Sequence, residues 1–434
     1  MRMKSMTVYA LCYAAAWLFA KSGHFYLSGA GLIGAALYLY LMDYKRTENM
    51  LNLRGLFSLS WVGGQGLACL KLSRLGADWP AMTWLCFLAA FAGFYAVFWF
   101  LEHYIGTERV SPMRFNAFGN YEQSVFFCAC GLTAVSVGCF LIEAAALGYV
   151  PLFVRGVPHA YSAFHLTGIH YFTVSSVLVP SLCVIYYCIN RGRNRAGSAI
   201  IAVLGLIALA IPILCVSRFQ LIFAVILAVL TYIQMDSRLN LLYAVFALAA
   251  LVPLYLLLTV ARSHDVTYLN AVFEMKNGNM PIFITQPYMY VANNYDNFNC
   301  LVEELGSHSW GLKMLAPLWT LSGLKFKFPG LVNFPYFVNK EELTTLTVFY
   351  DAYYDFGIIG VLGLSCILGA LAFYMMQAMK KVRNPIMYLF YSQIAIYMML
   401  SFFTTWFSNP TTWFYLAVTG AAAFAVSRRW GTIK

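Results

Sequence analysis

Charged residues are scarce in this chain of 434 residues, where Asp, Glu, Lys and Arg together make up only 10%. A soluble protein carries about a quarter charged residues, so the composition excludes an ordinary soluble domain. Segments of about ten residues with alternating polarity, the pattern of a membrane β-barrel, are also lacking. Hydrophobic residues make up 61% and fall in repeated runs long enough to cross a bilayer as helices. We therefore expect an all-α integral membrane protein.

Metal-binding and disulfide patterns are missing as well. Ten of the 11 cysteines lie inside apolar runs, Cys300 alone lies in a loop, and no CxxC or HExxH spacing occurs. We expect the cysteines to be small hydrophobic residues of the core. His159, His165 and His170 share one loop, but their six- and five-residue spacings match no compact ligand motif. The sequence thus predicts no metal and no cofactor.

The apolar runs predict about twelve membrane spans joined mostly by short loops. Their expected ranges are 6–21, 24–42, 51–72, 80–102, 121–146, 164–189, 197–216, 219–235, 240–261, 355–378, 385–405 and 412–427. The first run follows a basic start but lacks a small-residue cleavage site, so we interpret it as a span. No convincing internal repeat and no separate soluble domain is visible, so residues 1–434 are expected to form one polytopic domain.

The distribution of Lys and Arg predicts the orientation. If the N-terminus is cytoplasmic, that side carries 17 of the 28 Lys and Arg residues and the short loops of the other side carry five. Basic residues concentrate on the cytoplasmic side of membrane proteins, so both termini are expected there. The net charge of +11 therefore reflects topology, and we expect no nucleic-acid partner.

The 93 residues from Arg262 to Tyr354 are polar and aromatic, and they separate the ninth and tenth expected spans. This outward-facing segment holds 18 aromatic residues, nine Asn, eight acids and six bases. Aromatic rings stack on sugars and amides bind their hydroxyls, so we predict a partly helical loop that binds carbohydrate, although single rings also fit an interfacial aromatic belt. The predicted substrate-binding residues are Tyr268, Tyr288, Tyr290, Asn293, Asn294, Tyr295, Tyr350, Asp351, Tyr354 and Asp355, with Arg155 from the loop 147–163.

Two arginines stand at the outer ends of neighbouring apolar runs. Arg218 follows Ser217, and Arg262 opens the run Arg262-Ser263-His264-Asp265. Each arginine either extends toward lipid phosphates or grips a diphosphate through the paired donors of its guanidinium. His264 and Asp265, beside Arg262, are candidates for a general base. Arg218, Arg262, His264 and Asp265 form the predicted catalytic set.

Two further stretches of this segment are expected to lie at the membrane. Trp310–Leu324 is apolar enough to lie in the bilayer interface or to dip into it. Thr347–Gly360 opens the tenth span, where Tyr354 and Asp351 are expected to face an outer cavity. The simpler interpretation of Asp355 is a helix cap.

The layout resembles the bacterial oligosaccharide repeat-unit polymerases of the O-antigen and capsule class, which are related to the O-antigen ligases. The similar features are the many spans, the Pro151-Leu152-Phe153 loop, the Ser217-Arg218 turn, the large late outer loop and the Tyr-x-Asp-Phe-Gly-x-x-Gly stretch within Thr347–Gly360. The first outer loop, 21–24, contains no acid. This disfavours the membrane glycosyltransferase class that binds metal there and favours a type B layout.

The resemblance implies a metal-independent, inverting glycosyltransferase at the outer face of the bacterial plasma (inner) membrane. Its donor would be an undecaprenyl-diphosphate-linked oligosaccharide held by Arg218 and Arg262, with an outer-loop acid or histidine assisting. His264 and His308 are both open as counterparts of the histidine in the ligases. Membrane lipid, a chain-length regulator and a flippase are the other expected partners. A ligase that transfers finished glycan, and a flippase of lipid-linked glycan, are the alternative functions.

Overall fold

The computed structural model describes residues 2–106, 120–154, 160–235 and 266–428. Within these ranges helices dominate, and the one extended pairing is an isolated bridge between Ser73 and Met275. Seven helical segments there are long and apolar enough to cross a membrane. They are Phe25–Thr47, Ala81–Ile105, Glu122–Leu147, Ile169–Asn190, Arg195–Leu214, Arg218–Met235 and Tyr350–Lys381. The protein is therefore α-helical and membrane-embedded, while the count of twelve spans stays a prediction.

The helices lie where the apolar runs predict them. Each expected span contains a helix, apart from 240–261, which lies outside the described residues. The helix in 385–405 is only 14 residues long, Ile386–Met399, and is shorter than a bilayer crossing requires. The chain divides into two compact units, each described below by itself.

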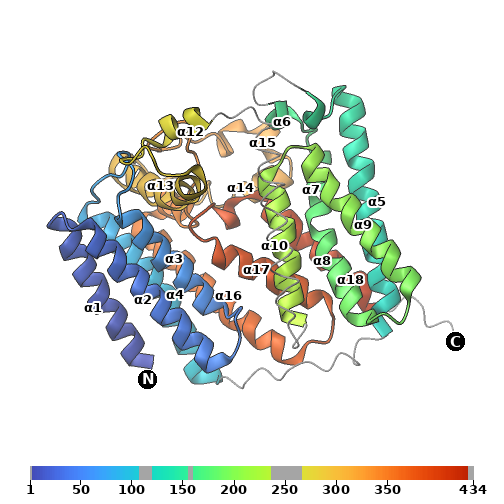
Figure 1. Cartoon of the computed structure of the whole chain (residues 1–434), viewed down its shortest axis with the longest axis horizontal. Helices are drawn as coiled ribbons and strands as arrows, with labels where there is room; N and C mark the ends of the chain where they lie inside the picture. Colours follow the sequence, from blue (N-terminus) through green and yellow to red (C-terminus); the bar gives the residue numbers. More distant parts are fainter. Residues whose placement is uncertain (1, 107–119, 155–159, 236–265, 429–434) are drawn as a thin grey trace. The chain divides into compact units, whose positions relative to one another are not determined.

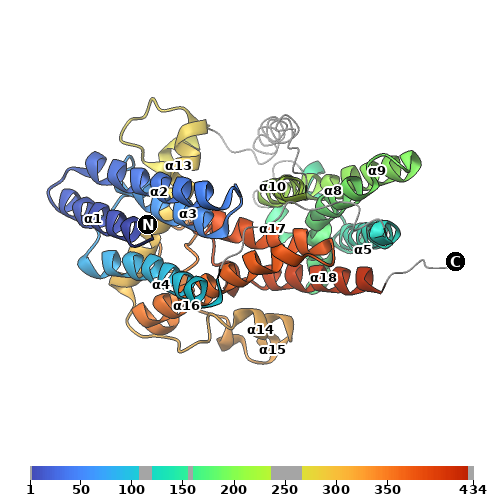
Figure 2. The same cartoon turned by 90° about the horizontal axis from the view of Figure 1, so that it is seen from below.

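Unit 1 comprises Met1–Arg109, Val266–Ala378 and Tyr397–Thr412. Its helices are α1 (Arg2–Lys21), α2 (Phe25–Thr47), α3 (Leu53–Cys69), α4 (Ala81–Ile105), α12 (Val266–Phe273), α13 (Ile282–Glu304), α14 (Ala316–Leu321), α15 (Leu324–Lys327), α16 (Tyr350–Ala378) and the short 3-10 turns η4 (Pro329–Leu331) and η6 (Trp406–Ser408). Helix α2 packs between α1 and α3, and α4 packs along α16 (Figures 1 and 2). Helix α13 lies against α3, which attaches the segment that the sequence predicts to face outward to the N-terminal helices.

Unit 2 comprises Val110–Asp265, Met379–Ile396 and Trp413–Lys434. Its elements are α5 (Glu122–Leu147), η2 (Pro151–Phe153), α6 (Ala160–Ala163), α7 (Ile169–Val174), η3 (Ser175–Leu178), α8 (Val179–Asn190), α9 (Arg195–Leu214), α10 (Arg218–Met235) and η5 (Met379–Lys381). Helix α8 packs against α5, α9 and α10. Helices α17 (Ile386–Met399) and α18 (Pro410–Ser427) contribute residues to both units.

The core of unit 1 is aromatic. Trp61 of α3 is fully buried and lies 4.8 Å from the ring of Phe349 and 5.2 Å from the ring of Tyr295. Phe57, one turn earlier, stacks on Phe94 of α4 at 4.1 Å. Large rings bury much apolar area and favour tilted or offset contacts of this kind. This cluster packs α13 and the start of α16 against α3 and α4.

Helix α16 is broken near its start. Phe356 and Gly357 have non-helical backbone angles, and Gly357 has φ 59° and ψ −146°, a conformation open essentially to glycine. A short helical piece, Tyr350–Asp355, therefore precedes the long apolar helix. The sequence predicts a span beginning at 355, and the structure shows the helix beginning five residues earlier with a break at that point.

Candidate functional site

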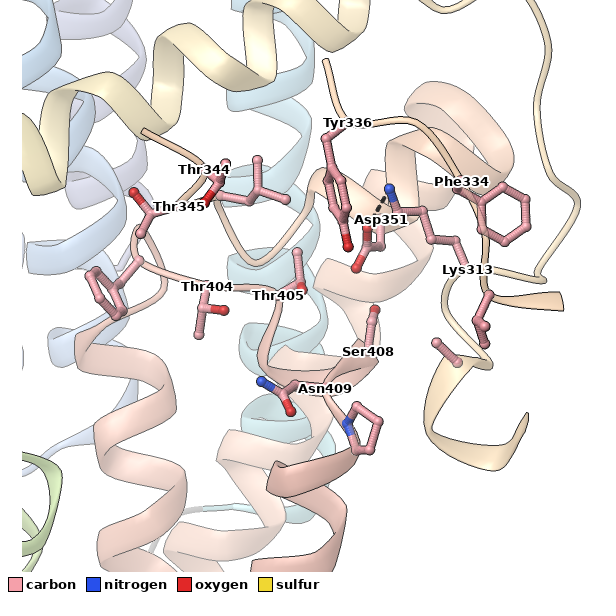
Figure 3. Close-up of a pocket in the computed structure, with 15 residues that line it drawn as sticks. Lys313, Phe334, Tyr336, Thr344, Thr345, Asp351, Thr404, Thr405, Ser408 and Asn409 are labelled. Carbon is pink, nitrogen blue, oxygen red and sulfur yellow. Dashed lines mark ion pairs between the residues drawn. The ribbon is translucent and has the colours of Figure 1, made fainter. Parts of the chain in front are cut away.

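A pocket of about 550 Å³ opens within unit 1 (Figure 3). It lies between the segment that the sequence predicts to face outward and residues 403–410, which follow α17. Its wall combines aromatic rings with hydroxyl, amide, ammonium and carboxylate groups. The lining residues are Lys313, Ala316, Val332, Phe334, Tyr336, Thr344, Thr345, Leu346, Asp351, Phe403, Thr404, Thr405, Ser408, Asn409 and Pro410. A cavity of this size holds a sugar unit or a similar small polar group.

Lys313 and Asp351 form an ion pair in the pocket wall. The Lys313 Nζ lies 3.5 Å from Oδ1 of Asp351, and the two side chains are only 7% and 6% exposed. On the pocket side, the hydroxyl groups of Thr405 and Ser408 interact with the same carboxylate (Figure 3). Burying two charges is costly unless they are paired and further bonded. The two hydroxyls meet the second condition for Asp351, whereas Lys313 Nζ and Asp351 Oδ1 are buried without a hydrogen bond to any described residue.

Three tyrosine rings surround the ammonium of Lys313. Its Nζ lies 4.2 Å from the ring centre of Tyr354, 4.4 Å from that of Tyr336 and 5.1 Å from that of Tyr350. Ring faces attract a cation, which partly replaces its lost hydration. Burial lowers the pKa of Lys313, and the Asp351 carboxylate acts in the opposite direction. The ion pair thus fixes the Asp351 carboxylate in the wall, and the two charges of the pair largely cancel.

Asp355 holds the turn that carries Lys313. Its Oδ2 accepts the Met314 N–H at 2.7 Å, and its Oδ1 accepts the Lys313 N–H at 3.2 Å and the hydroxyl of Ser309. Asp355 is fully buried, and the backbone groups it satisfies belong to another segment. The interpretation of Asp355 as a helix cap is wrong, because these bonds run to the 309–314 turn, whereas its contact with substrate stays a prediction. Its role is to fix the 309–314 turn.

The asparagines of α13 hold the backbone segments that form the pocket wall through hydrogen bonds. Asn297 donates to the carbonyls of Leu343 and Thr345 at 2.7 and 2.9 Å, and Asn294 donates to the Phe402 carbonyl at 2.7 Å. Asn294 Oδ1 also accepts the Thr345 hydroxyl at 2.5 Å. These bonds hold 343–345 and 402–404 in place, because a buried carbonyl needs a donor.

Asn293, predicted to bind substrate together with Asn294, also bonds within the protein. Its Nδ2 donates to the Leu343 carbonyl at 3.3 Å. Both side chains are buried, at 2% and 0% exposure. Both amides therefore bond within the protein in this structure, and their contact with a sugar stays a prediction.

Three of the predicted tyrosines are likewise internal. Tyr288 accepts the Leu72 N–H at 2.8 Å, and Tyr295 donates to the Trp61 carbonyl at 2.7 Å. Tyr350 exchanges two hydrogen bonds with the backbone of Phe337, at 2.8 and 3.0 Å. Their hydroxyls fix the packing of the outward segment, whereas the ring of Tyr350 also faces Lys313. Among the predicted tyrosines whose side chains the structure describes, Tyr290 is the most open, at 36% exposure, and its ring centre lies 5.9 Å from that of the pocket residue Phe403.

The predicted catalytic set is only partly described. Arg262, His264, Asp265 and Arg155 lie outside the described residues, and of Tyr268 only the helical backbone within α12 is described. Arg218 is the first residue of α10 in unit 2 and is buried, at 7% exposure. Its predicted grip on a diphosphate stays a prediction.

The histidines divide between the two units. His170 of unit 2 pairs with the buried Glu143 at 3.0 Å, whereas His308 of unit 1 contacts the Tyr354 carbonyl through Nδ1 at 3.2 Å. His159 lies outside the described residues. Across the ranges that the structure describes, no group of three or more His, Cys, Asp or Glu side chains could hold a metal ion.

Sequence reasoning missed Lys313 and the whole 403–410 wall. A lysine inside the apolar run WGLKMLAPLW is a signal, because such a charge needs a specific partner. Thr404 and Thr405 end the expected span 385–405, and Ser408 and Asn409 follow before the next span, so this polar cluster is also a signal of a polar site. Asp351 and Tyr354, by contrast, were predicted to face a cavity, and Asp351 does line the pocket.

Comparison with known proteins adds no family to this picture. No protein-family model, curated protein or solved structure matches the chain. The candidate site therefore rests on the chemistry of its own residues and on their positions in unit 1.

Proposed function

We propose that the protein is a membrane glycosyltransferase that joins lipid-diphosphate-linked oligosaccharide units at the outer face of a bacterial plasma membrane. The observation that carries the proposal is the pocket around Lys313 and Asp351, in which aromatic rings and hydroxyl groups line one cavity. The membrane-embedded helices around it suit a substrate with a lipid tail. The resemblance in layout to repeat-unit polymerases supplies the choice of substrate.

The pocket chemistry suits an uncharged sugar. The rings of Tyr336, Phe334 and Phe403 offer apolar faces, while Thr404 and Asn409 offer hydrogen-bonding groups. Sugars present the same combination, with apolar ring faces and a rim of hydroxyls. The one cation and the one carboxylate of the wall neutralise each other, so the site lacks the clustered bases that a polyanion would require.

In the proposed reaction, a hydroxyl of the sugar in the pocket attacks the anomeric carbon of the donor glycan. A new C–O bond forms, the bond to the diphosphate breaks with its electron pair going to the lipid diphosphate, and the hydroxyl proton passes to a carboxylate. Asp351 is the pocket carboxylate in that role, and Lys313 is the positioning residue that fixes it. The resemblance implies that Arg218 and Arg262 stabilise the leaving diphosphate.

The test is a reconstituted assay with purified protein and lipid-linked repeat units from the source cells, with products resolved by size. A ladder of products is expected from the unchanged protein with chelator present. Asp351→Asn should reduce product by a factor of about 10² or more, the usual contribution of a positioned base. Glu341→Gln, which removes an exposed acid from the same segment, is the matched control and should retain the ladder.

Further variants separate the roles. Lys313→Arg keeps the charge and should retain more product than Lys313→Met, provided both are recovered folded from the membrane. Loss of product in Asp265→Asn or His264→Ala, with full product in Asp351→Asn, would move the proton acceptor to that pair. Transfer of one finished glycan without a ladder would indicate a ligase, and substrate appearing across the bilayer at unchanged size would indicate a flippase.

A further inference from the structure

The outward segment carries an unusual run of exposed apolar side chains between Trp310 and Phe328. Trp310 is 75% exposed, Phe326 64% and Leu318 54%. The other large exposed residues of the run are Leu315, Leu321, Leu324 and Phe328. Soluble surfaces avoid contiguous apolar patches of this kind, so the run has a partner that removes it from water.

The helical geometry directs these side chains to one side. Leu315, Leu318 and Leu321 are three residues apart around α14, a spacing that places them on one helix face. Pro317 is the buried residue of α14, and its neighbour Ala316 lines the pocket. Helix α14 therefore has one side toward the pocket and an apolar side turned outward.

The run is attached where the long apolar helix begins. The Trp310 N–H donates to the Asp355 carbonyl at 3.2 Å, and the Trp310 ring lies 6.2 Å from that of Phe356. Just past the break, Ile359 is 76% exposed on a helix that is apolar enough to span a membrane. Exposed apolar side chains thus occur both at Trp310 and at the start of the span to which Trp310 is bonded. Tryptophan is enriched in membrane proteins at the membrane–water interface, where spans begin and end.

The end of the run is basic. Lys325 and Lys327 lie 5.3 and 5.5 Å from the ring centres of Phe326 and Phe328, which follow them in the chain. Alternating aromatic and basic residues are typical of segments at the boundary between acyl chains and lipid phosphates. There the rings are buried among the acyl chains and the ammonium groups contact the headgroups.

We propose that Trp310–Phe328 is an interfacial element that lies in the headgroup layer of the bilayer and forms the lipid-facing edge of the pocket. Its apolar side contacts acyl chains, and Lys325 and Lys327 contact anionic lipid phosphates. Lys313 and Ala316 belong to both this element and the pocket wall. A ligand with a polar head and a lipid tail therefore enters the pocket from the membrane. This last consequence rests on the proposed function, whereas the membrane contact does not.

The experiment places an environment-sensitive fluorophore at position 318 through a genetically encoded azide side chain. The full-length protein is reconstituted in phosphatidylethanolamine–phosphatidylglycerol vesicles with plain or brominated acyl chains. Blue-shifted emission and quenching by bromine are expected at 318. The same label at the exposed Asn333, in the same outward segment, should show neither. Emission at 318 as solvent-exposed as at 333 would overturn the proposal. A blue shift without quenching would also overturn it, because protein would then cover the run.

A second arm tests the lysines and the substrate route. The double change Lys325→Gln with Lys327→Gln should weaken quenching in vesicles that contain phosphatidylglycerol and have no effect in pure phosphatidylcholine. Leu318→Asp should raise KM for lipid-linked substrate several-fold while kcat changes little, because the pocket itself is intact. Quenching at 318 with no glycosyl transfer by any variant would leave the membrane contact established and refute the proposed function alone.

Discussion

At the residue scale, two buried lysines form ion pairs with acids of the segment 262–354. Lys313 pairs with Asp351 at the pocket, and Lys71 pairs with Asp296 at 3.0 Å beside the ring of Trp79. Burial raises the pKa of Asp296, and the Lys71 ammonium acts against that effect. Such a pair adds little net stability, but it becomes expensive when one partner is removed.

Asp296→Asn should therefore destabilise the protein by about 3–5 kcal/mol, because Lys71 is left buried without its counter-charge. The measurement is thermal unfolding of the purified protein in detergent. Glu274→Gln is the control, since its pair with Lys340 is far more exposed, at 41% and 25%, and exposed pairs contribute about 0–1 kcal/mol. Equal losses in the two variants would show that burial does not decide the cost of breaking these pairs.

The sequence predicts which residue types gather in the outward segment but not what they bond. Asn294 looks like a sugar ligand because its amide is polar and its neighbours are aromatic. Its actual partners include the carbonyl of Phe402 and the hydroxyl of Thr345, which come from distant parts of the chain. Asp351 is predicted correctly to face a cavity, because a charge in an apolar setting requires a special environment, whereas the partners of Asp355 are not predictable from its neighbours.

At the scale of single elements, the break in α16 positions the site. The break separates the short helical piece that carries Asp351 from the long apolar helix. Asp355, the residue immediately before the break, accepts a hydrogen bond from the turn that carries Lys313. Apolar runs predict the long helix well, because the run length follows from bilayer thickness. The break depends on one glycine conformation, and hydropathy does not record backbone angles.

Gly357→Ala should destabilise the protein by at least about 1 kcal/mol, because φ 59° with ψ −146° strains any residue with a Cβ. The new methyl would also lie 3.2 Å from the His308 ring. Gly363→Ala in the same helix meets no atom within 4 Å and should be neutral or slightly stabilising. Melting temperatures in detergent test this pair of variants. A tolerated Gly357→Ala would mean that the break survives without glycine.

At the scale of the whole molecule, the described chain forms two compact units. Helix positions were predictable because hydropathy and helix length are both set by the membrane. The division into units was not, since residues 379–396 lie in unit 2 although residues 266–378 and 397–412, on either side of them, lie in unit 1. Contacts between residues so distant in sequence leave no local pattern.

The Lys and Arg distribution predicts that both chain ends are cytoplasmic and that the segment 262–354 is outside. Alkaline phosphatase fused after Asn333 should be active, because it folds only outside the cytoplasm. Green fluorescent protein fused after Lys434 should fluoresce. If green fluorescent protein fused after Asn333 fluoresced and phosphatase at the same position were inactive, the predicted orientation would be wrong and the pocket would not face outward.

The bond from Asn294 to Phe402 also bears on how the protein is made. These residues are 108 positions apart, so α13 leaves the ribosome well before the chain that completes its bonding. At bacterial-to-eukaryotic synthesis rates of about 5–20 residues per second, the delay is roughly 5–20 s. Throughout that interval the Asn294 amide lacks the Phe402 carbonyl as its partner. A chain truncated before residue 402 would therefore export the outward segment without ever closing its pocket.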